Sequence, residues 1–349
     1  MSPQASCQIS CPTTITKLCI TPRHVIATTN PGTVIVLEIT CEHHNLENDP
    51  HKRIIEAGEL WDIDWYDLFL VTGNADGTAR LWNIENGVKL KEFPEHGDCI
   101  HAVLMPDEST VITGTGANTH TIRVWDVASG SCSHKFDHHT RGIIRLKTIG
   151  NQLISGSYDQ TVRIWDLVTG NELHRLEGHA RYPSVFGFND DETLMAVSCG
   201  TGDIKIWRIK DGTYVTTCQG HTWVANQLEN RNGNLVSASS DGTIRTWNWE
   251  DGSLLHAIDP AHQGISNLTN AVRGMAWTNL YMITGGFRDG LLKVWDKESN
   301  VLLLERHVGH TGIGNVVGGE GKVAVSSKVR HGLYQITLWD RGMIDAEGL

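Results

Sequence analysis

The chain has 349 residues, of which 40% are hydrophobic and 20% are charged, and its formal net charge is −11 at pH 7. These apolar side chains are sufficient for a folded core, which excludes a disordered chain. The acidic balance opposes binding to nucleic acid or to an anionic membrane surface. Because no apolar run approaches the roughly 20 residues of a membrane helix and the N-terminus lacks a signal-peptide pattern, we expect a soluble protein of the cytoplasm or nucleus without membrane insertion.

Strand-like runs separated by turn residues recur along nearly the whole chain. The stretch 142–179 shows the repeated unit most clearly. Its strand-like runs at 142–148, 153–155 and 161–165 are separated by tight turns, and a fourth run ends at Gly178-His179. This pattern predicts one small antiparallel sheet of four strands.

The unit recurs eight times at a nearly constant period. The predicted units cover residues 12–57, 59–97, 99–140, 142–179, 184–221, 224–262, 270–310 and 312–340. The third strands of the last seven units carry a tryptophan, spaced 40 to 48 residues apart, at Trp82, Trp125, Trp165, Trp207, Trp247, Trp295 and Trp339. A period of this length, with Gly-His at one end and Trp-Asp at the other, is the WD-repeat signature.

One architecture satisfies this repeat. A four-stranded sheet cannot bury both of its faces alone, so the units must stack radially. The sequence therefore predicts an all-β, eight-bladed WD-repeat β-propeller that forms a single domain over residues 1–349. The last unit lacks chain for an outer strand, whereas residues 7–10 form an isolated strand-like stretch. We expect residues 7–10 to complete the eighth blade and close the ring.

The 18 histidines and eight cysteines do not follow a metal-binding pattern. No CxxC occurs, and the group Cys41, His43, His44 and His51 matches no familiar zinc spacing. Other histidines recur with the repeat, at the place where a WD repeat joins His to a Ser or Thr, an Asp and the Trp. Two such relays are predicted, from His139, Ser155, Asp159 and Trp165 and from His221, Ser237, Asp241 and Trp247; a partial set is Thr72, Asp76 and Trp82. We expect structural histidines, no metal and no cofactor.

No constellation of residues predicts catalysis. Asp62 and Asp64 alternate along a strand, and no carboxylate pair stands out as a general acid and base. A phosphate-binding glycine loop, a GxSxG turn and kinase motifs are missing from the sequence. We therefore predict a protein that is not an enzyme.

The residues that vary between units predict a binding face instead. One position about six residues after the repeat histidine should ring the mouth of the central channel, and it is occupied by Thr16, Trp61, His101, Arg145, Phe186, Asn226, Arg273 and Asn315. Turns and loops on the same face add Tyr158, Phe287, Arg288, Lys328, Arg330, Arg141, Arg181, Tyr182 and Trp223. Arginine among aromatic residues is the composition of protein-binding hot spots, and arginine also binds phosphate in a bidentate manner. We predict that Arg145, Tyr158, Arg273 and Arg288 contact a ligand, unless these arginines lie on the face without a function.

Over nearly its full length the chain resembles the propeller of the F-box/WD-repeat substrate receptors of cullin-type ubiquitin ligases. The resemblance rests on the eight units, the closing strand, GELW at 58–61, GIIR at 142–145 with SGSYD at 155–159, and the long hairpin at 325–340. In that family a ring of arginines on the top face binds a phosphothreonine-containing degron. Arg145 and Tyr158 occupy matching positions, whereas His101 stands where the family typically has arginine.

Two functions are compatible with these observations. The resemblance implies a module that recognises an acidic or phosphorylated peptide of a protein partner. Ligase subunits would join only if an F-box comes from missing sequence or another chain, because about six residues precede the closing strand. The alternative is a general WD-repeat scaffold in signalling or organelle dynamics that binds protein partners without phosphate.

Overall fold

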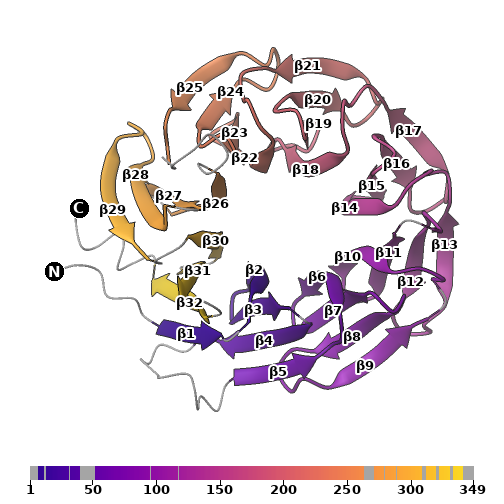
Figure 1. Cartoon of the computed structure of the whole chain (residues 1–349). Helices are drawn as coiled ribbons and strands as arrows, with labels where there is room; N and C mark the ends of the chain where they lie inside the picture. Colours follow the sequence, from indigo (N-terminus) through magenta and orange to yellow (C-terminus); the bar gives the residue numbers. More distant parts are fainter. Residues whose placement is uncertain are drawn as a thin grey trace.

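The chain folds into a ring of eight sheets in the computed structural model, which describes residues 7–11, 13–30, 32–39, 52–94, 96–116, 118–262, 271–278, 280–287, 289–308, 312–319, 322–330 and 333–340. Each sheet has four antiparallel strands, and the sheets stand around a central channel (Figure 1). The predicted all-β, eight-bladed propeller is confirmed. The segments described contain strands and turns but no helix, and hence no helix able to span a membrane.

Seven blades use four consecutive strands that run from the channel outward. Blade 1 contains β2 (Ile15–Ile20), β3 (His24–Thr29), β4 (Thr33–Glu38) and β5 (Lys52–Glu56), and blade 2 contains β6 (Leu60–Tyr66), β7 (Phe69–Asn74), β8 (Ala79–Asn83) and β9 (Lys89–Phe93). Blade 3 contains β10 (Ile100–Asp107), β11 (Thr110–Thr115), β12 (Ile122–Asp126) and β13 (Cys132–Phe136), and blade 4 contains β14 (Ile143–Ile149), β15 (Gln152–Ser157), β16 (Val162–Asp166) and β17 (Glu172–Leu176).

The second half of the ring repeats this order. Blade 5 contains β18 (Pro183–Phe188), β19 (Leu194–Cys199), β20 (Ile204–Arg208) and β21 (Tyr214–Cys218), and blade 6 contains β22 (Ala225–Arg231), β23 (Asn234–Ser239), β24 (Ile244–Trp247) and β25 (Leu254–Ile258). Blade 7 contains β26 (Val272–Trp277), β27 (Tyr281–Gly286), β28 (Leu291–Asp296) and β29 (Leu302–His307), and blade 8 contains β30 (Ile313–Gly319), β31 (Lys322–Arg330), β32 (Leu333–Asp340) and β1 (Cys7–Cys11).

The core lies between neighbouring blades. All six residues of the second strands β3, β19 and β27 are buried, because each of these strands is covered on both faces. Glycine in the second strand lets the next blade approach closely: a Cβ on Gly114 would lie 2.6 Å from Cγ2 of Ile143, the first residue of the next inner strand. The interface between blades 3 and 4 therefore requires glycine at position 114.

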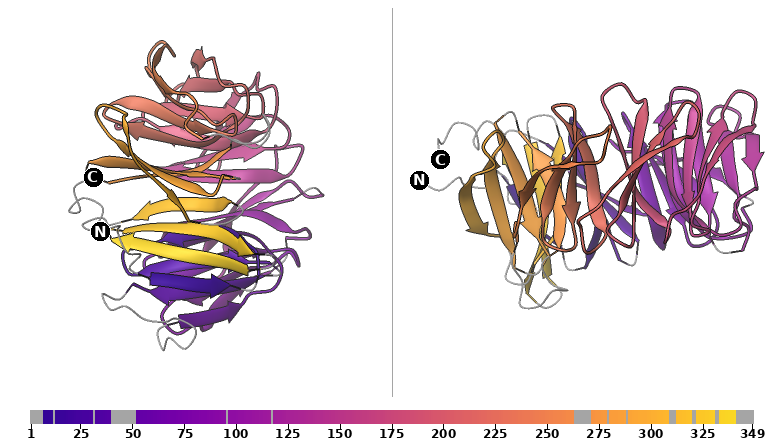
Figure 2. Two further views of the ribbon diagram at one scale, coloured as in Figure 1. Left: turned by 60° about the vertical axis from the view of Figure 1, so that its left-hand side comes forward. Right: turned by 90° about the horizontal axis from the view of Figure 1, so that it is seen from above.

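The N-terminal strand closes the ring. β1 pairs antiparallel with β32, from Cys7 opposite Leu338 to Cys11 opposite Tyr334. Figure 2 shows the yellow C-terminal strands beside the indigo N-terminal blade. The prediction of a closing strand at 7–10 is confirmed, and the strand is one residue longer.

Deletion of residues 1–11 should destabilise the whole ring, because it leaves one edge of β32 unpaired and removes the contact between the ends of the chain. We expect the free energy of unfolding to fall by at least about 2 kcal/mol, since several ladder hydrogen bonds disappear. Urea unfolding followed by circular dichroism measures the change. Deletion of residues 341–349 is the control, and equal stabilities of both truncated proteins would contradict the closing role of β1.

Candidate functional site

A bulge marks the start of every inner strand. In each blade the pairing between the first and second strands skips one residue on the first strand: Thr16, Trp61, His101, Ile144, Ser184, Asn226, Arg273 and Gly314. A bulge residue is left out of the ladder, and bulges are common beside functional sites. The same face carries the turns between second and third strands, and we call it the top face.

Five of the eight predicted ring residues are bulge residues, and three are displaced. Arg145 and Asn315 follow the bulge by one residue and Phe186 follows it by two. For Arg145 the reason is the spacing: the bulge of blade 4 comes five residues after His139, as that of blade 3 comes five after His96, and Arg145 is the sixth residue. Ile144, Ser184 and Gly314 therefore hold the equivalent positions.

Two of the displaced residues, Arg145 and Phe186, make contacts between blades. Arg145 is exposed, and its Nε donates to the Ser184 carbonyl of the next blade at 2.7 Å, while its Nη1 donates to the Ile144 carbonyl at 2.9 Å. The Phe186 ring packs against Gly156 of the preceding blade, where a Cβ would lie 2.9 Å from Cζ. Arg145 thus remains exposed at the channel with two of its nitrogens bound to carbonyls, whereas Phe186 packs against the neighbouring blade.

The predicted arginines are not gathered at one place. Arg273 lies in blade 7, and its guanidinium stands 4.2 Å from the centre of the Phe287 ring. Arg145 belongs to blade 4, on the opposite side of the channel (Figure 1). Arg288 and the group Cys41, His43, His44 and His51 lie outside the described residues.

Four aromatic side chains instead form a row across the top face from blade 2 to blade 5. The Trp61 and His101 rings are 4.5 Å apart, His101 and Tyr158 are 6.4 Å apart, and Tyr158 and Tyr182 are 5.1 Å apart between centroids. Trp61, Tyr158 and Tyr182 are 56%, 40% and 43% exposed. We call Trp61, His101, Tyr158 and Tyr182 the aromatic row.

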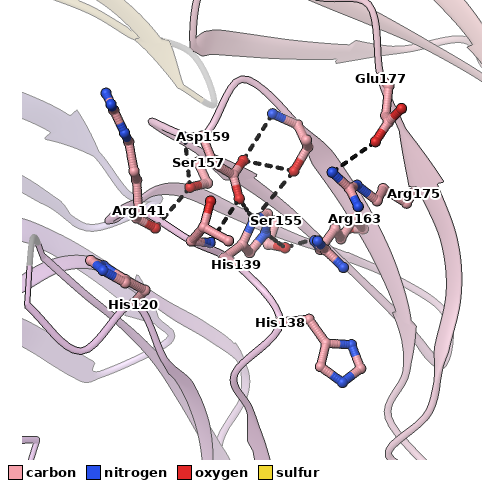
Figure 3. Close-up of polar contacts among 12 residues, drawn as sticks. His120, His138, His139, Arg141, Ser155, Ser157, Asp159, Arg163, Arg175 and Glu177 are labelled. Carbon is pink, nitrogen blue, oxygen red and sulfur yellow. Dashed lines mark hydrogen bonds and ion pairs between the residues drawn. The ribbon is translucent and has the colours of Figure 1, made fainter.

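Positive charge flanks the aromatic row. Arg141 and Arg181 are exposed, and neither has an ion-pair partner among the residues that the structure describes. Figure 3 shows Arg141 extending away from the buried contacts of its blade. Trp223 is 43% exposed in the loop before blade 6, and the described rings of the row make no contact with it. The top face is thus aromatic and basic on an acidic protein.

A cavity of about 630 Å³ in the channel reaches from blade 1 to blade 4. Lys17 Nζ donates to Asp62 Oδ1 at 2.7 Å, and Asp62 raises the pKa of the Lys17 ammonium although burial opposes it. Asp62 accepts from the Val103 amide, and Asp64 accepts from the Met105 amide at 2.7 Å. Burial raises the pKa of Asp64. These aspartates tie blade 2 to blade 3, a role that the alternation of Asp62 and Asp64 along one strand could have indicated.

The predicted relays are buried hydrogen-bond chains. His139 donates from Nδ1 to Asp159 at 2.8 Å, and its Nε2 lies 2.8 Å from the Ser155 hydroxyl (Figure 3). The Ser155 oxygen also accepts from Trp165 Nε1 at 2.9 Å. His221, Ser237, Asp241 and Trp247 repeat these contacts at 2.7–2.9 Å. A third relay joins His262, Asp289, Thr284 and Trp295. Since buried polar groups need partners, these contacts stabilise the blades.

Blade 5 has an incomplete relay. Val197 occupies the position that is Ser155 in blade 4, so the hydroxyl is missing. His179 Nδ1 contacts the Cys199 thiol at 3.1 Å, whereas His179 Nε2 and Trp207 Nε1 are buried without a partner. In blade 2, Trp82 donates to Thr72 at 3.1 Å, but Asp76 binds Thr78 and Arg80 instead of a histidine.

No group of three His, Cys, Asp or Glu side chains in the described part of the chain could hold a metal ion.

Comparison with known proteins identifies the repeat. The family model described as "WD domain, G-beta repeat" matches residues 87–126, 130–166, 170–208 and 212–248. The WD40 repeats that this model matches thus lie within an eight-bladed β-propeller. The chain is also similar to the crystal structure of the computationally designed Ika8 protein, with a TM-score of 0.81 and 25% identity over 97% of this chain and 99% of the other.

The curated relatives are diverse and longer. Autophagy-related protein 16 of Arabidopsis thaliana is 24% identical over 180 residues, which cover 50% of this chain and 35% of the relative. Mitochondrial division protein 1 of Schizosaccharomyces pombe is 30% identical over 192 residues, covering 49% and 26%. Nuclear distribution protein PAC1 of Saccharomyces cerevisiae is 25% identical over 235 residues, covering 62% and 43%. The chain thus spans less than half the length of these relatives, and none of their names describes an F-box receptor.

Replacement of Val197 by Thr should complete the relay of blade 5. The new hydroxyl would contact His179 and Trp207 as Thr113 contacts His96 at 2.7 Å and Trp125 at 3.0 Å in blade 3. We expect the free energy of unfolding to rise by about 1–2 kcal/mol, the usual cost of buried polar groups without partners. Urea unfolding measures the change.

The matched control is Val236→Thr in blade 6, where the buried valine belongs to an apolar cluster. This variant should be destabilised, because its hydroxyl is buried among apolar groups. Equal losses of stability in V197T and V236T would show that the two orphaned atoms of blade 5 cost nothing.

Stability should fall as the pH is lowered from 6.5 to 4. Burial lowers the pKa of His96 and that of His179 from an ordinary value of 6.5 to about 4. Below pH 6.5 the unfolded chain binds protons that the folded chain excludes, so each histidine reduces stability by up to about 1.4 kcal/mol per pH unit. Urea unfolding at pH 7, 6 and 5 tests this, and His179→Gln should lose stability less steeply than the parent protein. The same dependence of the unfolding free energy on pH in both proteins would contradict the lowered pKa of His179.

Proposed function

We propose that the chain is a non-catalytic protein-interaction scaffold that binds a segment of a protein partner across the aromatic row. The exposure of Trp61, Tyr158 and Tyr182 on one face supports this proposal above all. Aromatic side chains supply large contact areas with little conformational freedom to lose, and they dominate the energetics of protein interfaces. A rigid propeller holds four such rings in mutual contact before a partner arrives, which reduces the entropy lost on binding.

Binding that does not depend on phosphate is the favoured form. Arg145, which matches the phosphate-binding position of the ligase receptors, uses two of its nitrogen atoms on backbone carbonyls at 2.7 and 2.9 Å. Arg273 stacks on Phe287 across the channel. The names of the relatives, which concern autophagy, mitochondrial division and nuclear distribution, favour a scaffold in organelle dynamics within the cytoplasm or nucleus.

An acidic or phosphorylated segment is the second candidate ligand. Arg141 and Arg181 flank the tyrosines of the row, and the described carboxylates leave both guanidiniums unpaired. Nearby carboxylates are already engaged: Asp98 accepts from Asn118 and Cys99, and Asp159 belongs to the His139 relay. An anionic partner would therefore meet uncompensated positive charge at this end of the row.

The double variant Trp61→Ala, Tyr158→Ala should lose its partners. We expect affinity to drop more than about tenfold, because hot-spot aromatics commonly contribute 2 kcal/mol or more. The tagged chain and the variant are used to capture proteins from native cells, and the recovered proteins are quantified by mass spectrometry. Phosphatase treatment of the lysate separates the two candidates, because it abolishes capture only for a phosphorylated segment.

Tyr66→Ala is the matched control, since Tyr66 is 42% exposed at the opposite end of the strand that carries Trp61. The control should capture the same proteins as the parent chain. Full recovery of partners by the double variant would contradict binding at the aromatic row and would favour the sides or the opposite face of the ring.

A further inference from the structure

A cysteine and a histidine lie in contact beneath the aromatic row. Cys99 Sγ is 3.3 Å from His101 Nε2, the distance at which an imidazole accepts a thiol proton. Cys99 is partly exposed to solvent. Both residues lie against Gly116, where a Cβ would be 2.7 Å from Sγ and 2.8 Å from Nε2. The close approach of Gly116 leaves the pair no room to separate on that side.

The pair has the components of an activated nucleophile. Burial lowers the pKa of His101, and Asp98 only partly opposes this shift, so the imidazole is neutral near pH 7 and can act as a base. The Cys99 thiol also faces a second acceptor, because it lies within hydrogen-bond distance of Asp98 Oδ1 and can donate to it at 3.4 Å. The Asp98 carboxylate is held by the amides of Cys99 and Asn118 and by the Asn118 side chain, and these bonds outweigh burial and lower its pKa.

A second Cys–His contact provides an internal comparison. Cys199 Sγ lies 3.1 Å from His179 Nδ1, but Cys199 is 2% exposed and burial raises its pKa to about 12. Cys218 is also buried, and burial raises its pKa to about 12. Cys132 is exposed, but its thiol contacts the His134 carbonyl, which cannot take a proton. Cys199, Cys218 and Cys132 thus each lack one of the two features that Cys99 combines, which are partial exposure to solvent and a neighbouring base.

We propose that Cys99 is a peroxide-sensitive modification site, with His101 as the base that activates its thiol.

The reaction is a two-electron oxidation. His101 Nε2 takes the thiol proton, and the sulfur attacks one oxygen of hydrogen peroxide. The S–O bond forms as the O–O bond breaks, and the leaving hydroxide takes the proton from the imidazolium to give water. The cysteine becomes a sulfenic acid and the peroxide is reduced. No other reactant is needed.

Oxidation would act directly on the aromatic row, since His101 contacts both Trp61 and Tyr158. A sulfenic acid adds a polar oxygen beside His101 in a tightly packed position. The expected consequence of this oxidation, weaker binding of a partner, rests on the proposed function. The oxidation of the Cys99 thiol does not depend on that function.

The test uses the purified full chain in reduced form. It is treated briefly with hydrogen peroxide, sulfenic acids are trapped with dimedone, and labelled peptides are quantified by mass spectrometry. We expect Cys99 to be labelled at least about tenfold faster than Cys132, as general-base assistance allows, and Cys199 to remain unlabelled. Equal rates at Cys99 and Cys132 would overturn the proposal.

Two variants assign the role of the histidine. His101→Gln should slow labelling of Cys99 to about the rate of Cys132 without changing Cys132. His138→Gln is the control, because His138 is an exposed histidine whose partner is Glu172. Unfolding midpoints verify that both variants are folded, and an unchanged rate at Cys99 in H101Q would overturn the assignment.

Partner capture then tests the link to the row. Oxidised parent protein should capture less partner than reduced protein, whereas Cys99→Ser should capture the same amount before and after peroxide. An equal loss of captured partner in the peroxide-treated parent protein and in peroxide-treated C99S would overturn the link between oxidation and binding. Failure of the proposed function remains distinguishable, because the labelling rates are measured without any partner.

Discussion

A four-stranded sheet with two apolar faces can be stable only between two similar sheets, and every other feature of this propeller depends on that requirement. A row of such sheets ends wherever the chain ends, unless the last sheet meets the first. The pairing of β1 with β32 provides that meeting, because the eighth blade takes strands from both ends of the chain. The free energy of closure is therefore shared by all blades, and no blade has to be stable alone. This sharing explains how blade 5 tolerates buried His179 and Trp207 nitrogens without partners.

The inner strands combine two tasks that fall on neighbouring residues. The bulge residue is left out of the ladder and, as with Trp61, can face the mouth. The next residue binds the following blade: Lys17 donates to the Ile63 carbonyl, Asp62 accepts from Val103, and Gln227 exchanges hydrogen bonds with Met275. Arg145 follows the same rule with Ser184. An arginine whose sequence position places it near the channel mouth can thus also join two blades.

The fold could be predicted from the sequence because its cause is periodic. Tryptophans at regular spacing, turn residues and histidines repeat with each blade, so the members of the relays around Ser155 and Ser237 follow from the repeat alone. The top face could not be predicted equally well, because its residues are those that do not repeat. A displacement of one residue exchanges the bulge residue Ile144 for Arg145, which binds the Ser184 carbonyl of the next blade. The aromatic row comes from four blades, and no local pattern links Trp61 to Tyr182. The contact of Cys99 with His101 likewise involves a bulge residue, His101, that the strand pairing skips.

The eight bulges also separate recognition from folding. Each bulge position is supported by the ladder of its own sheet on both sides, so its side chain can change without altering the pairing of the strands. The positions now held by Ile144, Ser184 and Gly314 carry small or aliphatic residues, while those of Trp61 and His101 carry rings. Each blade thus contributes one variable bulge residue to the rim of the channel. Few substitutions at the bulge positions would therefore be needed for such a protein to bind a new partner. A library of variants randomised at these eight positions would test different ligands on the same propeller fold.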